Sequence, residues 1–201
     1  MKAQTRDVSI AELNAQIAAE LAQDRKIAAM FADACRDSDA ESLLQAAQLM
    51  AFTYEGWRLA MRRVARLGEV SAEIREVFIP IWVEHKALPR RVAHRPTMAA
   101  ALRVLMRGDY VGPELTLYRG TSHFERRRQL YGFSWTTAIE TAREFAERNS
   151  KSKDARAMVL TTVAPSAAIL LRREPEGYYD EGEIVVDPFR LGTIKAIPVE
   201  D

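Results

Sequence analysis

The spacing of apolar residues changes at Leu115, and this change divides the chain into two differently folded parts. Before Leu115, apolar side chains recur at the three- and four-residue intervals of amphipathic helices, whereas after it they follow the pattern of short strands. Helices gathered in one part and strands in the other are typical of an α+β architecture. We therefore expect a helical N-terminal region over residues 1–110 and a β-rich core with a mixed sheet over residues 111–201, the two forming one compact unit.

Composition and charge restrict the possible partners only loosely. The 201 residues are 48% hydrophobic and 28% charged, which is typical of a globular protein and argues against disorder. With 29 basic and 28 acidic residues the net charge is +1, so charge alone does not indicate a nucleic-acid partner, although it leaves one open. Arg126-Arg127-Arg128 could contact phosphates or RNA, but a solvated loop is the simpler interpretation.

Cysteine and histidine usage predicts neither a disulfide nor a metal site. Cys35 is the only cysteine, and the three histidines are scattered without ligand spacing. The N-terminal residues 1–24 carry charges throughout and contain no continuous apolar run, so they predict neither a secretion signal nor a membrane span. We expect a cytoplasmic protein without membrane contact, which a route that needs no such signal could still deliver into another cell.

Helix signals punctuate the N-terminal part. Capping boxes at residues 9–12 and 38–41 each predict the start of a helix, and the second helix is expected to run as far as Gly68. A further helix is expected over residues 71–86, ended or kinked by Pro80. Four residues at core spacing on these helices are expected to be buried: Met50, Tyr54, Trp57 and Met61.

Six strand-like runs follow in the C-terminal part, with one helix among them. The helix is expected to start at the capping-box spacing Thr137-x-x-Glu140 and to end near residue 149. The expected strands cover residues 115–120, 131–137, 158–163, 167–171, 181–186 and 192–199.

Two carboxylates share one side of the fifth expected strand. Alternation along a strand places Glu181 and Glu183 on one face, and the small or apolar Gly182, Ile184 and Val186 on the other. Two acids directed at one space on a rigid strand suit acid–base chemistry. The alternative is that they are the solvent side of an edge strand, where charge discourages pairing with other chains.

Three short motifs, taken in order, resemble the arginine–serine–glutamate class of ADP-ribosyltransferases, which contains many bacterial toxins and effectors. Members of that class carry an Arg on a first strand, a Ser-Thr-Ser-like triplet on a second and Gln/Glu-x-Glu on a later one. The corresponding segments here are Tyr118-Arg119-Gly120, Ser134-Trp135-Thr136 and Glu181-Gly182-Glu183. The triplet departs from the pattern, because Trp135 replaces a Thr and Thr136 replaces a Ser. The resemblance covers residues 115–199 and implies an ADP-ribosyltransferase-like fold there.

The resemblance implies that NAD is the co-substrate and that Glu183 is the central catalytic residue. Its carboxylate would stabilise the cation-like ribose formed when nicotinamide leaves. Ser134 would hydrogen-bond Glu183 and keep it aimed, with Thr136 supporting the same strand face. Arg119, with the adjacent Gly120, would bind the dinucleotide at its phosphates or the adjoining ribose.

The acceptor is also implied by the resemblance. Glu181 would bind and help deprotonate it, and Glu at this position implies protein arginine. Tyr178 and Tyr179 lie in the loop that would recognise the acceptor. Phe133 either stacks near nicotinamide or belongs to the core, and the sequence leaves both open.

The function implied is mono-ADP-ribosylation of a macromolecule, with release of nicotinamide and no metal requirement. Two alternatives remain at this point. Water could be the acceptor, which would make the protein an NAD glycohydrolase, or the fold could be kept as a non-catalytic interaction domain.

Overall fold

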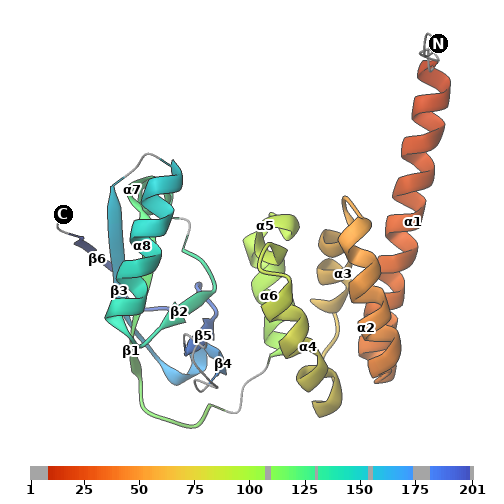
Figure 1. The fold of residues 1–201 in the computed structure, drawn as a ribbon. Helices are drawn as coiled ribbons and strands as arrows, with labels where there is room; N and C mark the ends of the chain where they lie inside the picture. Colours follow the sequence, from red (N-terminus) through yellow and green to blue (C-terminus); the bar gives the residue numbers. More distant parts are fainter. Residues whose placement is uncertain (1–8, 107–109, 130, 154–155, 174–181, 200–201) are drawn as a thin grey trace. The chain divides into compact units, whose positions relative to one another are not determined.

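A computed structural model describes residues 9–106, 110–129, 131–153, 156–173 and 182–199. Backbone contacts divide the chain into two compact units, Met1–Leu105 and Met106–Asp201. The first unit is helical and the second contains the sheet, as the colours of Figure 1 show. The predicted α+β class, with helices mostly in the N-terminal part, is confirmed.

Within the described residues, the helical unit contains six α-helices and one 3₁₀ turn. The first helix, α1, packs against α2 and α3 through a core that includes Phe31 and Trp57, whose rings meet edge to face with centroids 5.5 Å apart. The elements are α1 (Ile10–Asp37), α2 (Ala40–Leu49), η1 (Met50–Phe52), α3 (Gly56–Val64), α4 (Ala72–Glu84), α5 (Leu88–Val92) and α6 (Arg95–Leu105).

Capping explains where the first two helices begin and end. The predicted capping box at the start of α1 is confirmed, since Ser9 and Glu12 bond reciprocally. The second prediction is wrong. Ser38 ends α1 in the left-handed conformation with φ 60°, and the N-cap of α2 is Asp39, whose side chain accepts a bond from the Ser42 backbone N–H at 3.0 Å.

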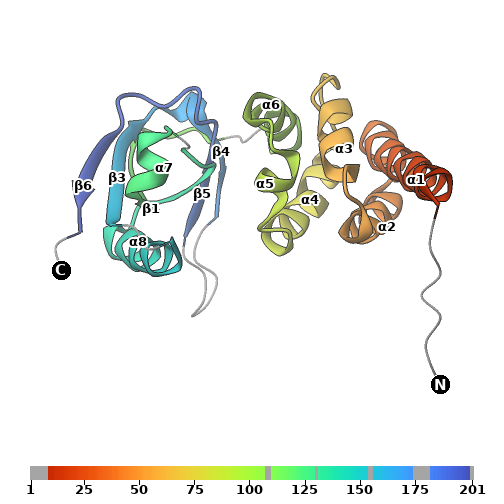
Figure 2. The same ribbon diagram turned by 90° about the horizontal axis from the view of Figure 1, so that it is seen from above.

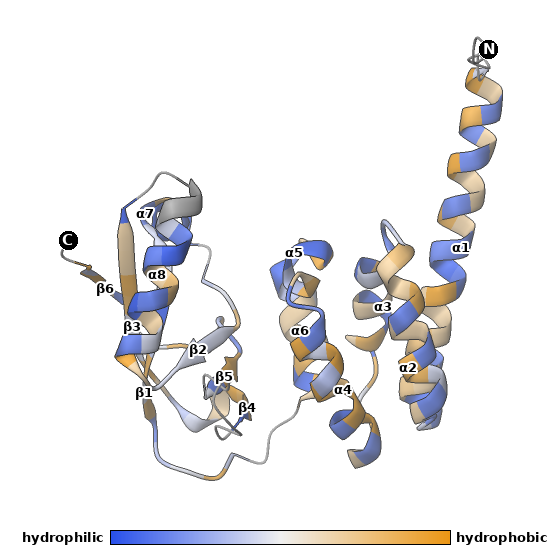
Figure 3. Ribbon diagram, in the orientation of Figure 1, coloured by the Kyte–Doolittle hydropathy of each residue, from blue (hydrophilic) through white to orange (hydrophobic). Residues whose placement is uncertain are grey.

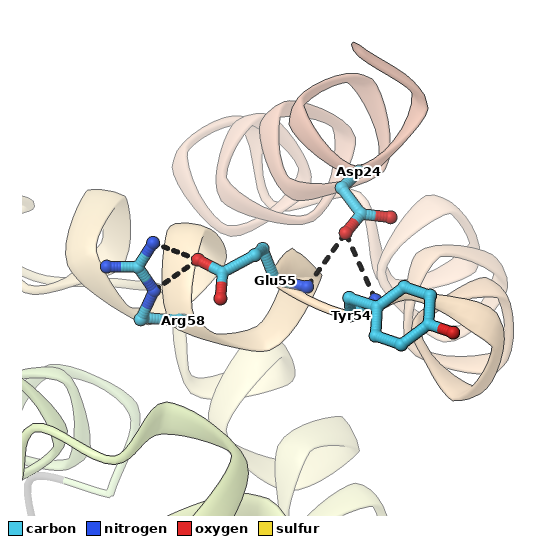
Figure 4. A network of polar contacts seen from close by, with 4 residues as sticks. All are labelled: Asp24, Tyr54, Glu55 and Arg58. Carbon is cyan, nitrogen blue, oxygen red and sulfur yellow. Dashed lines mark hydrogen bonds and ion pairs between the residues drawn. The ribbon is translucent and has the colours of Figure 1, made fainter. Parts of the chain in front are cut away.

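The single long helix expected from residue 38 to Gly68 is interrupted between α2 and α3. Asp24 of α1, which is 5% exposed, accepts hydrogen bonds from the backbone N–H groups of Tyr54 at 3.1 Å and Glu55 at 2.7 Å (Figure 4). Glu55 also forms an ion pair with Arg58 one turn further along. A carboxylate from another helix therefore holds the turn directly before α3 and stabilises the break, and local spacing alone cannot reveal such a tertiary contact.

The interruption also changes which side chains are buried. Met50, Trp57 and Met61 are buried as expected, whereas Tyr54 is 82% exposed because it lies on the turn rather than on a helix face. Arg91 of α5 donates from its guanidinium to two carbonyls of the same segment, those of Met50 at 3.2 Å and Thr53 at 2.5 Å.

Pro80 neither ends nor shortens its helix. The N-cap Ser71 starts α4 as expected, and the helix continues through Pro80 to Glu84. Proline removes one backbone donor and crowds the preceding turn. Burial of Phe78, Ile81 and Trp82 on either side supplies packing that outweighs this local preference.

The second unit forms an antiparallel sheet with the strand order β4-β5-β2-β1-β3-β6 among the described residues. The expectation of a mixed sheet is wrong, because each pair of neighbouring strands is antiparallel. A sequence pattern marks strands but not their relative direction. The elements are β1 (Leu115–Ser122), α7 (His123–Arg127), β2 (Ser134–Thr136), α8 (Ile139–Lys153), β3 (Ala157–Ala164), η2 (Ser166–Ala168), β4 (Ile169–Arg172), β5 (Glu183–Val186) and β6 (Lys195–Pro198).

The two faces of this sheet are covered differently. One face carries the apolar cluster around Leu117, Trp135, Leu160 and Ile184. On the opposite face, α8 lies along β1 and β3, as Figure 2 shows. We call this second side the α8 face.

No helix within the described ranges is long and apolar enough to cross a membrane.

Replacing Asp24 by Ala is expected to destabilise the helical unit by about 1.5–3 kcal/mol, because two N–H groups lose their charged acceptor. Asp24→Asn should cost less, since an amide oxygen can still accept. Urea unfolding followed by helical circular dichroism measures both variants. Asp33→Ala, at an exposed position on the same helix, is the control and should stay within about 0.5 kcal/mol of wild type. Equal stability of Asp24→Ala and wild type would contradict this role of Asp24.

The thiol of Cys35 is expected to be inert in the folded protein. Cys35 is fully buried, and burial raises its pKa to about 12, so the reactive thiolate is scarce at neutral pH. A thiol-specific disulfide reagent should label it slowly in the native chain and at once in denaturant, and Asp24→Ala should speed the native reaction. Rapid labelling of folded wild type would show that the helical core opens far more readily than its packing implies.

Candidate functional site

The short strand β2 brings the three sequence motifs together. It lies between β1 and β5, with Thr136 directly opposite Tyr118 on one side and Glu183 on the other. Directly opposite residues in antiparallel strands share a face, with Cβ atoms about 4.5–5.5 Å apart. Tyr118, Thr136 and Glu183 therefore form a row across three adjacent strands.

This row belongs to the α8 face. Tyr118 packs against the cluster formed by α8 and β3, and the Thr136 hydroxyl accepts a bond at 3.1 Å from the backbone N–H of Ala138, just before α8. Thr136 is 7% exposed, whereas Tyr118 and Glu183 are half-buried. The row thus combines hydroxyls and a carboxylate at a partly solvent-accessible part of the sheet.

The register distinguishes Thr136 from Ser134. Ser134 shares the α8 face but lies opposite Val185, so Thr136 is the residue directly level with Glu183. Ser134 is half-buried and lies two pairs further along the strand. Trp135 points to the other face, where it is 3% exposed and its indole N–H donates to the Gly132 carbonyl at 3.0 Å. Trp135 therefore packs in the apolar cluster of the sheet.

Arg119 connects β1 to the backbone of β2. Its Nη1 donates to the Ser134 carbonyl oxygen at 2.6 Å, and its guanidinium lies so close to Gly132 that a side chain at that position would collide with it. Arg119 was expected at the end of its strand, but β1 continues to Ser122. Arg119 therefore fixes β2, the strand that carries Ser134 and Thr136.

Gly120 lies beneath α8. A Cβ atom at this position would overlap the carbonyl oxygen of Ala142 and the backbone nitrogen of Ala146. The absence of a side chain therefore allows the helix to pack directly on β1, beside Tyr118.

Phe133, directly before β2, and Asp187, directly after β5, hold the chain where these two strands meet. Phe133 is 3% exposed, and its carbonyl accepts a bond at 2.8 Å from the Val186 backbone N–H, which extends the pairing of β2 with β5. Asp187, fully buried directly after β5, accepts from the Phe189 backbone N–H at 3.0 Å and pairs with Arg190 at 3.4 Å.

Several predicted site residues lie outside the described ranges, namely Tyr178, Tyr179 and Glu181. Two residues that the sequence interpretation did not assign to the site are Tyr118 and Asp187. Tyr118 belongs to the Tyr-Arg-Gly motif, and strand alternation alone predicts that it points to the opposite face from Arg119. That it lies level with Thr136 depends on the register of the strands, which the sequence does not show. Asp187 precedes a proline and resembles an ordinary turn residue.

In the part of the chain that the structure describes, no group of three or more His, Cys, Asp or Glu side chains could hold a metal ion. Comparison with protein-family models, with curated proteins and with solved structures finds no match to this chain. Functional inference therefore depends on the site residues themselves.

Gly120→Ala is expected to destabilise the sheet unit by about 1–3 kcal/mol, because α8 must move away from β1 to admit the methyl group. Differential scanning calorimetry of the full chain measures the loss. Gly68→Ala is the matched control, since no heavy atom lies within 4 Å of the Cβ atom it would add. A Gly120→Ala protein as stable as the Gly68→Ala protein would contradict the close packing of α8 on β1.

Proposed function

We propose that the protein is an NAD-dependent mono-ADP-ribosyltransferase that transfers ADP-ribose to a macromolecular acceptor and releases nicotinamide. The observation that carries the proposal is the adjacency of β1, β2 and β5, which bear Arg119, Ser134 with Thr136, and Glu183. These motifs are distant in the sequence and meet in the middle of one sheet. Ser134, Thr136 and Glu183 share the α8 face, whereas alternation along β1 directs Arg119 to the opposite face.

Glu183 is the proposed catalytic carboxylate. It begins β5, and its backbone is held on both sides: it pairs with Thr136, and its carbonyl accepts from the Arg173 N–H at 3.0 Å. Cleavage of the nicotinamide–ribose bond develops positive charge on the ribose. A carboxylate on a fixed backbone stabilises that charge without reorganising during the reaction, which is where an enzyme gains most from electrostatics.

Ser134 and Thr136 are proposed to orient Glu183 and the ribose. Both lie on the α8 face, Thr136 level with Glu183 and Ser134 two residue pairs away. Hydroxyl groups can donate to a carboxylate and accept from a sugar hydroxyl at the same time. Their strand is fixed by pairing on both sides and by Arg119, so their geometry is supported by more than one element.

Arg119 is proposed to bind the dinucleotide as well as to hold β2. Its guanidinium is a planar fork of N–H donors, a geometry that matches the oxygens of a phosphate. Its guanidinium lies beside Gly132 and the Ser134 carbonyl, so it would bind the phosphates or the adjoining ribose of NAD at the start of β2. On the α8 face, the tight contact of Gly120 with α8 would limit the space over β1.

Protein arginine is the proposed acceptor. This part of the proposal is carried by the sequence pattern, in which Glu181 precedes Glu183 by two residues and Tyr178 and Tyr179 precede both. Glu181 would bind the guanidinium and take its proton, and the tyrosines would contact the target protein. An NAD glycohydrolase would need only the bond cleavage, and a non-catalytic interaction domain would need neither step.

The test measures nicotinamide release and transfer of label from labelled NAD to proteins of a lysate. Glu183→Gln is expected to lose about 10²–10⁴ of both activities, because its charge no longer stabilises the transition state. Glu181→Ala should release nicotinamide but label no protein. Glu144→Gln, an exposed site on α8, is the control and should behave as wild type.

Each alternative gives a different result. Nicotinamide release by wild type without any protein labelling would identify a glycohydrolase. The absence of both activities in a folded protein, together with no NAD binding, would leave an interaction domain. Full activity of Glu183→Gln would remove the proposed catalytic role of this residue.

A further inference from the structure

An apolar stripe runs along the whole of α1, but only its second half is covered. At 100° per residue, the residues at positions 10, 13, 17, 21, 28, 31 and 35 fall on one narrow side of the helix, with Asp24 among them. From Asp24 onward this side is buried against α2 and α3. Before it, Ile10 is 79% exposed, Leu13 50% and Ile17 45%.

The uncovered half projects beyond the rest of the helical unit. Figure 1 shows the start of α1 extending past α2 and α3, and Figure 3 shows apolar residues recurring along it. Residues 10–20 are exposed and Leu21 is half-buried. Apolar residues at core spacing on a helix usually face a packed partner. The exposed first half of the stripe is therefore expected to be an interface, as its second half already is against α2 and α3.

We infer that a second copy of this chain covers the stripe, with the two α1 helices packed antiparallel. The available length is residues 10–23, about 21 Å at 1.5 Å per residue. An antiparallel overlap that sets Ile10 level with Leu21 of the other copy makes Leu13 and Ile17 of the two helices interleave. The overlap ends where each helix enters its own bundle, so the two bundles lie at opposite ends of the contact. This is an isologous two-fold interface.

The charges and side-chain sizes favour this orientation. Glu12 and Glu20 are the only charged residues in positions 10–23. In the antiparallel overlap Glu12 lies level with Ala19 of the other copy, and Glu20 with Ala11. A parallel pair would instead place like charges level with each other. Ala11, Ala18 and Ala22 lie along one side of the stripe, where the helix backbones can approach closely, and Gln16 and Glu20 lie along the other.

The size of the contact sets its strength. Four apolar side chains from each copy bury less than the roughly 1,200 Å² of total surface typical of stable complexes. The dimer is therefore a weak one that forms as the protein concentration rises, and it is independent of the proposed enzymatic function.

Sedimentation equilibrium from about 1 μM to about 1 mM tests the inference. The mass of wild type should rise from 22.7 kDa toward twice that value. The double variant Leu13→Glu/Ile17→Glu should remain at 22.7 kDa, because it places charges in the contact. Ala15→Glu adds a charge on the opposite side of the same exposed helix and should associate as wild type. Circular dichroism checks that both variants keep their helix content.

Mixed single-cysteine variants test the orientation. Ile10→Cys mixed with Leu21→Cys should form the mixed disulfide under mild oxidation in preference to either symmetric one, because equal positions lie about 16 Å apart in the antiparallel pair. Buried Cys35 does not compete. A wild type that stays monomeric throughout the range, or an Ala15→Glu variant that dissociates as completely as the double variant, would overturn the inference. Symmetric disulfides would overturn the antiparallel arrangement.

Discussion

The pairing of β2 on both of its sides determines the geometry of the candidate site. This strand has only three residues, and its pairing with both β1 and β5 fixes the register of the three strands. A slip of one residue would turn Trp135 out of the core and bring Ser134 and Thr136 into it. Placing two hydroxyls in the apolar cluster and removing the indole from it makes that slip unfavourable, so the same burial that stabilises the sheet aligns Thr136 with Glu183.

Contacts beyond the strand pairing keep this alignment rigid. Arg119 binds the backbone of Ser134, α8 packs on Gly120 without an intervening side chain, and Asp187 secures the chain directly after β5. Each of these contacts uses backbone atoms, whose positions vary less than those of side chains. A carboxylate at position 183 is thereby held by its strand rather than by a loop, which is the arrangement that electrostatic catalysis needs.

Local patterns in the sequence predict the class of fold, the approximate strands and the sides to which Trp135, Ile184 and Thr136 point. They do not predict features that depend on contacts between distant segments. The break before α3 requires Asp24 of another helix, and a helix through Pro80 requires its packed neighbours. The register that pairs Thr136 with Glu183, and Tyr118 with Thr136, follows from assembly of the sheet and has no local signal.

The most direct measurement is a calorimetric titration of the full chain with NAD, comparing wild type with Thr136→Val, a change that keeps the size and the strand preference of the side chain but removes the hydroxyl. We expect saturable binding of NAD at one site in wild type, and clearly weaker binding by a Thr136→Val protein that remains folded. A folded wild type that binds no NAD, or a Thr136→Val protein that binds it as tightly as wild type, would contradict the placement of the nucleotide beside Thr136 and Glu183.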